Sequence, residues 1–259
     1  MEAGYAAAGL LVGFLVGLTG VGGGSLMAPL LILAFGFHPA VAVGTDLWFA
    51  AITKSVGGAI HGRLGTTDWV IVRRLALGSV PAAIAVLLWL DSRDSGLEVG
   101  FLTRLLGGAL LLTSLLLPLK GRLHAPLIRL RHKLGPQMRG HQVALTLIGG
   151  CIVGALVTLT SVGAGALVAV LLMFLYPLRL SARALVGTDI VHAIPLTLVA
   201  AIGHSWLGNV DWTLLLRLLL GSIPGIVLGS LLTHRVNEGL VRTCLAVMLF
   251  LSGIKLLLA

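Results

Sequence analysis

Lys54 is a charged residue in the later half of a long apolar stretch, residues 40–60. If that stretch crosses a membrane, an ionised side chain within it is costly and is usually retained for a function or a partner. Lys54 would then contact an anionic substrate or form a salt bridge to Asp46 or Asp189. The alternative is that its long side chain snorkels to the edge of the stretch, about two turns away at a helical rise of about 1.5 Å per residue.

Two glycine-rich stretches, residues 19–24 and 160–165, interrupt apolar runs. Each glycine in a helix costs roughly 1 kcal/mol relative to alanine, so we expect one helix to end and another to start at each stretch. A helix start exposes unpaired N–H groups and about half a positive charge, and glycine lets a ligand approach the backbone. The sequence therefore predicts an anion site between the two stretches, with close helix packing as the alternative. The candidate ligands there are Gly22, Gly23, Gly24, Ser25, Ser161, Gly163 and Gly165.

A Gly-Thr-Asp triplet follows each glycine-rich stretch and supplies Thr45, Asp46, Thr188 and Asp189. The threonine hydroxyls are candidate donors to substrate oxygens, or they bond back to their own helices. The aspartates could carry a coupling proton, hold the opposite half in place, or cap a broken helix at its positive end. His61 and His204 are candidate gating residues because histidine titrates near neutral pH, and simple packing at the membrane interface is their alternative role.

These residues recur because the chain contains one unit twice. At a constant offset of 143 residues, Gly44-Thr45-Asp46 returns as Gly187-Thr188-Asp189, His61 as His204, and Asp68-Trp69 as Asp211-Trp212. The Asp-Trp pairs are expected to cap the next helix and to anchor it at the membrane interface. We expect residues 1–118 and 143–259 to be two repeats, with residues 119–142 as a basic linker between them.

Composition places the chain in a membrane. Of its 259 residues, 58% are hydrophobic and 10% are charged, and the mean hydropathy of +1.07 exceeds what a soluble domain can bury. The first two apolar runs are each shorter than the roughly 20 residues that cross a bilayer, so we expect either tilted spans or a re-entrant hairpin. The runs predict helices at about 4–19, 25–36, 40–60, 70–90 and 99–118, then 143–160, 164–177, 182–203, 213–233 and 239–258.

Lys and Arg outnumber Asp and Glu by 18 to 9. Most of the basic residues lie in short loops between apolar runs, which is the positive-inside pattern, so no nucleic-acid partner is expected. With residues 119–142 in the cytoplasm, the remaining loop charges orient the two repeats oppositely, as in many secondary transporters. The predicted fold is an all-α integral membrane protein of the inner (plasma) membrane. It has two inverted repeats of about five helices each, with short broken or re-entrant glycine-rich helices at the centre.

The doubled pattern of a glycine-rich break, Gly-Thr-Asp, histidine and Gly-x-x-Asp-Trp resembles the TauE/SafE sulfite exporter family, also called the toluene-sulfonate uptake permease family. The resemblance covers nearly the whole chain. It implies a bacterial-type inner-membrane carrier of sulfite, sulfonates or related small organosulfur anions, with export the more frequent direction. Two departures make the halves unequal: Ser161 stands where the first repeat has Gly20, and Thr197 stands where it has Lys54.

We therefore expect a secondary transporter that binds a small sulfur-containing anion between the two glycine breaks, with Lys54, Thr45 and Thr188 as further ligands. Alternating access would come from a rocking motion of the two repeats. The alternative is a proton-linked carrier of a metal or another cation, and the paired aspartates and histidines favour it. Against it, His61 and His204 are expected to lie too far apart to share one ion.

An enzyme is not expected. An intramembrane hydrolase built on Ser161 would need a histidine nearby, and the mid-helix histidine of the second repeat, His192, is matched by Phe49 in the first. No cofactor and no resident metal are expected. The expected partners are the small anionic substrate and the lipid bilayer, and a homodimer is one assembly that the sequence allows.

Overall fold

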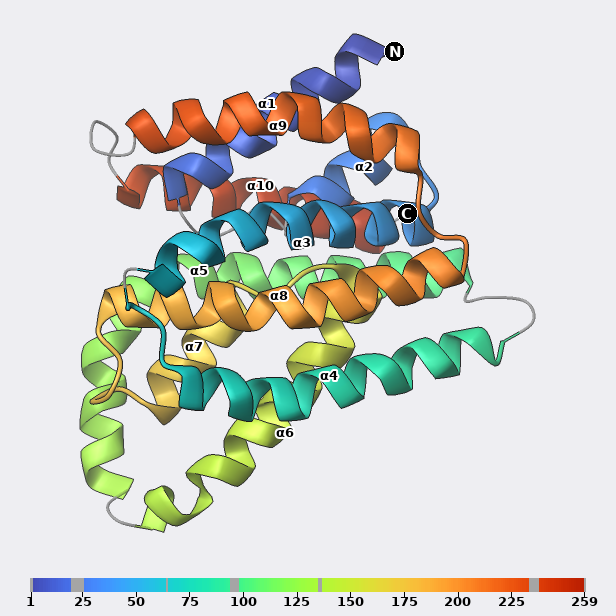
Figure 1. Ribbon diagram of the computed structural model, residues 1–259. Coiled ribbons are helices and arrows are strands. Elements are labelled where there is room, and N and C mark those ends of the chain that lie inside the picture. Colours follow the sequence, from blue (N-terminus) through green and yellow to red (C-terminus); the bar gives the residue numbers. More distant parts are fainter. Residues whose placement is uncertain are drawn as a thin grey trace.

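The computed structural model describes residues 2–19, 26–63, 65–93, 98–134, 137–232 and 238–258, and within them the chain forms ten helices and no strand (Figure 1). Each apolar run of the sequence is a helix, as predicted, which confirms the all-α class. The helices are α1 (Glu2–Thr19), α2 (Met27–Phe35), α3 (Pro39–Arg63), α4 (Trp69–Asp91), α5 (Val99–Leu134), α6 (Gln137–Thr160), α7 (Ala166–Leu175), α8 (Ala182–Trp206), α9 (Trp212–Leu232) and α10 (Glu238–Leu258).

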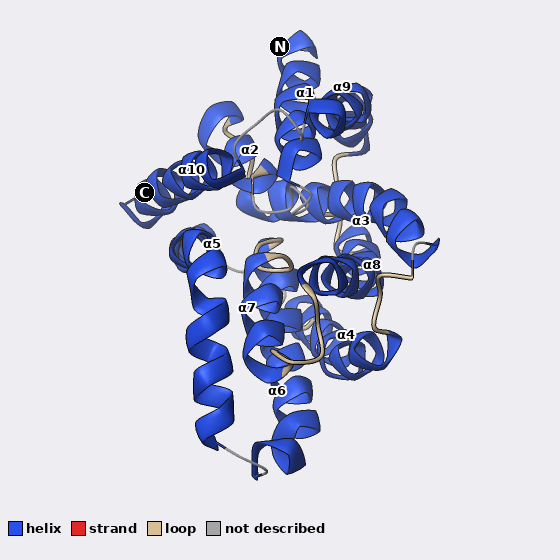
Figure 2. Ribbon diagram, turned by 90° about the vertical axis from the view of Figure 1, so that its left-hand side faces the viewer, coloured by secondary structure: helices blue, strands red, loops and turns tan. Residues whose placement is uncertain are grey.

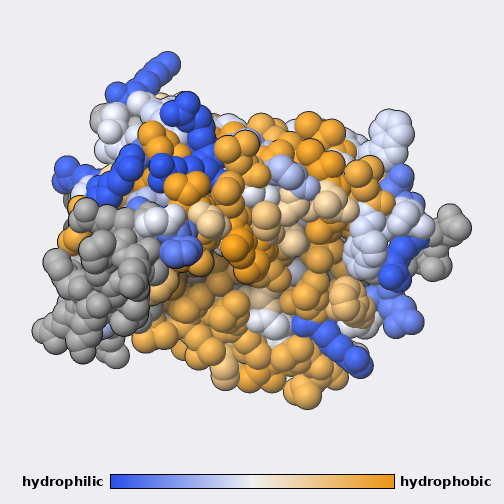
Figure 3. All heavy atoms as spheres, turned by 90° about the horizontal axis from the view of Figure 1, so that it is seen from below, coloured by the Kyte–Doolittle hydropathy of each residue, from blue (hydrophilic) through white to orange (hydrophobic). Residues whose placement is uncertain are grey.

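Six of these helices contain segments long and apolar enough to cross a bilayer: residues 69–91, 99–119, 140–160, 183–206, 212–232 and 239–258. Their outward faces carry large apolar side chains that a soluble protein would not expose, such as Leu77, Leu220 and Leu231, which are 69%, 73% and 69% exposed. Figure 3 shows these apolar residues as a broad band across the middle of one face, with hydrophilic residues gathered at its two ends. The protein is therefore a multi-pass membrane protein.

Helices α3 and α8 occupy matching places in the two halves and pack against each other in antiparallel directions. Two backbone-to-threonine bonds fix this direction. Thr45 Oγ1, near the start of α3, accepts a hydrogen bond from Asp211 N, just beyond the end of α8, at 3.1 Å. Thr188 Oγ1, near the start of α8, accepts one from Asp68 N, just beyond the end of α3, at 3.0 Å. The start of each helix therefore lies beside the end of its counterpart.

A second pair of matching contacts joins α1 to α9 and α6 to α4. In both pairs glycines bring the backbones into contact. A Cβ atom at Gly13 would lie 2.4 Å from the carbonyl oxygen of Ser222, and one at Gly154 would lie 2.2 Å from that of Ser79. Ser79 and Ser222 are themselves counterparts in the repeat. The two helices of each pair therefore approach closely for the same reason, because a glycine of one helix packs against the backbone carbonyl of the matching serine on the other.

The short helices α2 and α7 lie inside the bundle. They have 9 and 10 residues, so at about 1.5 Å per residue each covers only about half of a hydrocarbon core that is about 30 Å thick. Helix α2 ends at Gly36, whose φ of 69° gives the left-handed C-terminal cap typical of glycine. The short central helices predicted from the sequence are thus present. The first glycine-rich stretch, residues 20–25, lies outside the described residues.

The basic linker is helical where it is described. Helix α5 continues to Leu134 and α6 begins at Gln137, so residues 119–142 mostly extend these two helices. Pro118 and Pro126 lie inside α5, and the later part of α5 leaves the direction of its first part (Figure 2). A proline removes a backbone hydrogen bond and permits such a bend.

The contact between α4 and α6 can be tested by Gly154→Ala. The added Cβ meets the Ser79 carbonyl at 2.2 Å, so the helices must separate, and overpacking of this kind costs about 1–3 kcal/mol. We expect a lower unfolding temperature in detergent. Gly108→Ala on α5 is the matched control, because a Cβ there meets nothing within 4 Å and should leave the unfolding temperature unchanged or slightly raised. Equal stability of both variants would contradict this packing.

Candidate functional site

Lys54 is buried, with a relative exposure of 6%. It interacts electrostatically with Asp189 of α8 and with Asp46 of its own helix. Neither carboxylate is close enough for an ion pair, since the one ion pair among the described residues joins Arg179 and Asp68. The side chain is enclosed by protein instead of extended to the membrane edge, so snorkelling does not describe it.

Lys54 lies on α3 four residues before Gly58, which packs against Val191 and Ile194 of α8. Because the helices are antiparallel, this part of α3 runs beside the part of α8 that holds Thr197, the counterpart of Lys54 in the repeat. The Thr197 hydroxyl donates to Ala193 O of its own helix at 2.8 Å.

Asp46 caps the start of α2. Its Oδ2 accepts a hydrogen bond from Ala28 N, in the first turn of α2, at 3.3 Å. The residue preceding α2, Leu26, supplies no side-chain cap of its own. The capping role that the sequence left open for Asp46 is therefore confirmed. A carboxylate at this position offsets the partial positive charge of the helix start.

The stretch from Ser161 to Gly165 leads from α6 into α7 and holds two unusual backbone conformations. Ser161 has a φ of 57°, a left-handed conformation that costs a residue with a side chain roughly 1–2 kcal/mol, and Gly163 has a φ of 111°. Ser161 also lies beside the Asp46 carboxylate. At the start of α7, Gly165 provides no side-chain cap.

His192 and Ser79 form a buried pair that the sequence did not identify as functional. The His192 Nε2 atom on α8 lies 2.9 Å from Ser79 Oγ on α4. Lys54 acts on His192 electrostatically, so the pair belongs to the same region. One feature of the sequence could have indicated this pair: His192 stands where the first half of the repeat has Phe49.

Three buried polar atoms of this region have no hydrogen-bond partner among the residues that the structure describes. They are Asp46 Oδ1, Ser161 Oγ and His192 Nδ1. A buried polar atom without a partner costs about 1–3 kcal/mol, so such atoms are expected where a ligand completes the bonding. Together with Lys54 they define a candidate site between α3, α8 and the start of α7, which we call the central site.

The other predicted ligands lie elsewhere. Thr45 and Thr188 accept hydrogen bonds from Asp211 N and Asp68 N, at opposite ends of the α3–α8 pair. Both threonines therefore tie one half to the helix connection of the other. Asp68 and Asp211 also cap α4 and α9 through their carboxylates, as predicted. Gly22, Gly23, Gly24 and Ser25, and the side chain of His61, lie outside the described residues.

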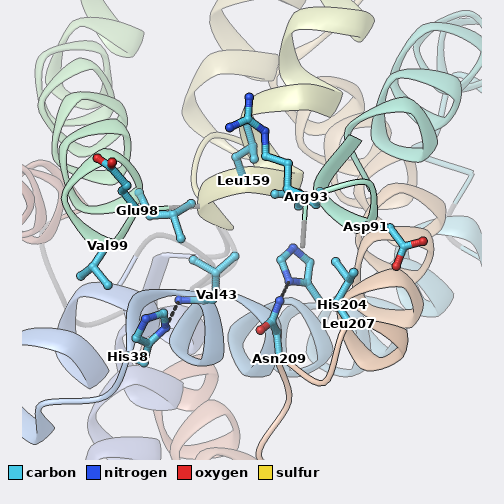
Figure 4. Close-up of a pocket in the computed structure, with 13 residues that line it drawn as sticks. His38, Val43, Asp91, Arg93, Glu98, Val99, Leu159, His204, Leu207 and Asn209 are labelled. Atoms are coloured by element: carbon cyan, nitrogen blue, oxygen red, sulfur yellow. Dashed lines mark hydrogen bonds between the residues drawn. The ribbon is translucent and has the colours of Figure 1, made fainter. Parts of the chain in front are cut away.

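His204 is buried at the inner wall of a cavity at one end of the molecule. Its Nε2 lies 2.9 Å from Thr158 O, and its Nδ1 lies 3.5 Å from Asn209 Nδ2. The cavity has a volume of about 530 Å³. Figure 4 shows Asp91 and Glu98 on opposite sides of the view, with His204 and Asn209 between them. We call this cavity the vestibule; its polar lining comprises His38, Asp91, Arg93, Glu98, His204 and Asn209.

The opposite end of the α3–α8 pair is tied together. Arg179 donates to both oxygens of Asp68, at 2.6 and 3.0 Å, and the two side chains are 46% and 18% exposed. Close by, the Tyr176 hydroxyl bonds to Thr146 Oγ1 at 2.8 Å and accepts from Arg74 at 3.2 Å. Because α3 starts at the vestibule and ends beside Asp68, the structure has a cavity at one end and a bonded cluster at the other.

A membrane-embedded helical bundle with a buried charged centre and a cavity at one end is an arrangement that membrane transporters have. The family model "Sulfite exporter TauE/SafE" matches residues 5–256, and the chain belongs to this family. It is 39% identical over 251 residues to "Probable membrane transporter protein YjnA" of Bacillus subtilis (strain 168), covering 96% of this chain and 97% of that protein. The chain is thus a transporter and not an enzyme.

More distant relatives carry similar names. "Probable membrane transporter protein YdhB" of Bacillus subtilis (strain 168) is 27% identical over 254 residues, or 95% of this chain and 96% of that protein. A "Probable membrane transporter protein" of Xylella fastidiosa (strain Temecula1 / ATCC 700964) is 29% identical over 238 residues, or 88% and 84% of the two chains. No solved structure matches.

The strained turn before α7 can be tested by comparing Ser161→Gly with Ser161→Ala. Both remove the hydroxyl, but only glycine adopts a φ of 57° without cost. We expect Ser161→Gly to be more stable than Ser161→Ala by about 1 kcal/mol, measured by thermal unfolding in detergent. Equal stability, or a less stable glycine variant, would contradict the left-handed conformation at this residue.

Proposed function

We propose that this transporter is a secondary carrier of small sulfur-containing anions such as sulfite or an organosulfonate, and that it works as an exporter. The observation that carries the proposal is the burial of Lys54 within electrostatic reach of Asp46 and Asp189. The description of the family as sulfite exporters supports the substrate class. The names of the relatives specify a transporter and no substrate.

The central site offers an oxyanion two kinds of donor. The Lys54 ammonium supplies a full positive charge in a region of low dielectric constant, where a charge-assisted bond is strong. The start of α7, from Gly163 to Gly165, supplies backbone amides and the positive end of a helix. The Ser161 hydroxyl, which lies beside the Asp46 carboxylate, adds a third donor. A small tetrahedral or pyramidal oxyanion has several oxygens to receive these bonds.

In this proposal Asp46 and Asp189 set the charge of the empty site. Asp46 holds the start of α2, and both carboxylates interact with Lys54 across a longer distance than an ion pair. Lys54 is therefore balanced but not neutralised by direct contact. Its N–H groups can turn to a substrate without breaking a salt bridge.

Alternating access between two inverted repeats, residues 1–118 and 143–259, is the proposed mechanism. The antiparallel packing of α3 on α8 supports it, because an inverted repeat has its counterpart helices antiparallel. The structure has the vestibule at one end and the Arg179–Asp68 ion pair at the other. A carrier that is open to one side of the membrane is expected to have such a difference between its ends. Breaking the ion pair and closing the vestibule would expose the central site to the opposite side.

The orientation follows from the basic residues. Arg63, Arg73 and Arg179 lie at or near the end of the molecule opposite the vestibule, and the positive-inside rule assigns that end to the cytoplasm. The basic stretch 119–142 is cytoplasmic in the same arrangement. The vestibule then faces outward from an inner (plasma) membrane.

The experiment that tests the substrate class is binding of sulfite, thiosulfate, a small sulfonate, Ni²⁺ and Co²⁺ to the purified protein by calorimetry. We expect binding of at least one sulfur anion and a loss of roughly 10- to 100-fold in its affinity in Lys54→Met, because a charge-assisted bond contributes about 1.5–3 kcal/mol.

The matched control is Thr197→Val, which alters the counterpart of Lys54 and should leave anion affinity within about twofold, since that hydroxyl is satisfied by its own helix. Native affinity in Lys54→Met would remove Lys54 from the site. Binding of the metals without binding of any anion would overturn the sulfur-anion proposal in favour of a cation carrier.

A further inference from the structure

The hydrogen bond between His192 and Ser79 joins the two repeats inside the membrane. His192 lies on α8 of the second half and Ser79 on α4 of the first, and both side chains are fully buried. The ring uses Nε2 for this bond, while Nδ1 has no partner among the described residues. The pair thus fixes the ring and leaves one nitrogen available.

The equivalent place in the other half shows that packing does not require this pair. The counterpart of His192 is Phe49, which is fully buried among apolar residues, and the counterpart of Ser79 is Ser222. The Ser222 hydroxyl has no partner among the described residues. An aromatic ring that forms no polar bond therefore fills the same place in the fold. The histidine is a chemical difference at a structurally equivalent position.

His192 faces the central site. It follows Asp189 by three residues, so both lie on the same side of α8. The positive charge of Lys54 on α3 acts on the ring and would repel a proton on it when no anion lies beside them. From α4 the ring meets Ser79, and the nearest thiol, that of Cys151 on α6, is bonded to the carbonyl of Gly78. Helix α7 contributes no titratable side chain to this region.

A count of charges indicates why a titratable ring belongs here. In the empty site, Lys54 and the positive starts of α2 and α7, each worth about half a charge, offset the carboxylates of Asp46 and Asp189. Binding of a monoanion adds one uncompensated negative charge in a region of low dielectric constant, where it is costly. Protonation of His192 would restore the balance.

We propose that His192 binds the proton that accompanies the anion through the membrane. This rests on the proposed anion carrier and assigns its coupling residue. The proton comes from water on the side to which the central site is open, forms an N–H bond at Nδ1, and returns to water on the other side together with the anion. In both states Nε2–H donates to Ser79 Oγ, so the serine positions the ring throughout. No covalent bond to the substrate forms.

The test uses purified protein in vesicles with a gradient of a small sulfonate, an internal pH dye and separate assay of the sulfonate. A sulfonate stays a monoanion near neutral pH, so, unlike sulfite, it carries no proton of its own. In the native protein we expect proton movement with the sulfonate, at a rate that depends on pH between about 5.5 and 8. His192→Phe, which installs the residue of the other half, should lose the proton that accompanies each sulfonate and the pH dependence of the remaining flux. His141→Ala changes an exposed histidine of α6 outside the central site and the vestibule, and as the control it should behave as the native protein does.

Proton movement and pH dependence that persist unchanged in His192→Phe would overturn the inference and leave the anion carrier intact. Absence of both sulfonate and sulfite flux in the native protein would instead overturn the proposed function, and the inference with it. If His192→Phe does not fold or does not transport, Ser79→Ala keeps the ring and removes its positioning bond. That variant should shift the pH dependence of sulfonate flux, and an unshifted profile would count against the proposal.

Discussion

The cost of burying the Lys54 ammonium inside a membrane governs the centre of this protein. An isolated charge in a region of low dielectric constant is unstable, so the surroundings must compensate it. Asp46 and Asp189 do so from α3 and α8 without forming a direct ion pair. In the proposed function, this separation leaves the ammonium balanced and able to bind an anion. A site that was fully paired would be more stable and would have no bonding capacity left for a ligand.

This balance depends on how α3 and α8 are held together. Thr45 and Thr188 bind the helix connection of the opposite half, one at each end of the pair. Outside them, α1 on α9 and α4 on α6 form close backbone contacts through glycines such as Gly13 and Gly154. Each half therefore supplies helices that complete the packing of the other. The two copies fold as one intertwined unit in which Lys54 lies near its own counterpart.

Two differences between the copies lie at the centre. Lys54 is matched by Thr197, and His192 by Phe49, whereas Gly13 and Gly154, the capping aspartates and the linking threonines are kept in both halves. Because the packing residues are duplicated but the residues at the centre are not, we propose that the two halves form one substrate site beside the repeat axis and not two equivalent sites. The two ends of the α3–α8 pair differ as well, since one holds the vestibule and the other holds the Arg179–Asp68 ion pair.

Much of this was predictable from the sequence, because apolar runs and their interruptions are set by residue type. All ten helices were expected, most of them at nearly their observed bounds, and so were the short helices and the Asp68 and Asp211 caps. The Ser79–His192 bond was not predictable, because it depends on which faces of α4 and α8 meet. The helical continuation through residues 119–134 differs from the predicted linker, because Leu, Arg and Lys favour helix even in a polar, basic stretch.

Alternating access means that one site opens in turn to the two faces of the membrane, and cysteine labelling at paired positions can detect this. Thr66 and Asn209 are counterparts in the repeat, in the α3–α4 and α8–α9 connections at opposite ends. Each would be changed to cysteine separately, in a detergent-solubilised chain with Cys151 and Cys244 replaced by serine. We expect sulfite to change the rates of thiol labelling at the two positions in opposite directions. Rates that change together, or not at all, in a protein that binds sulfite would rule out alternating access at this site.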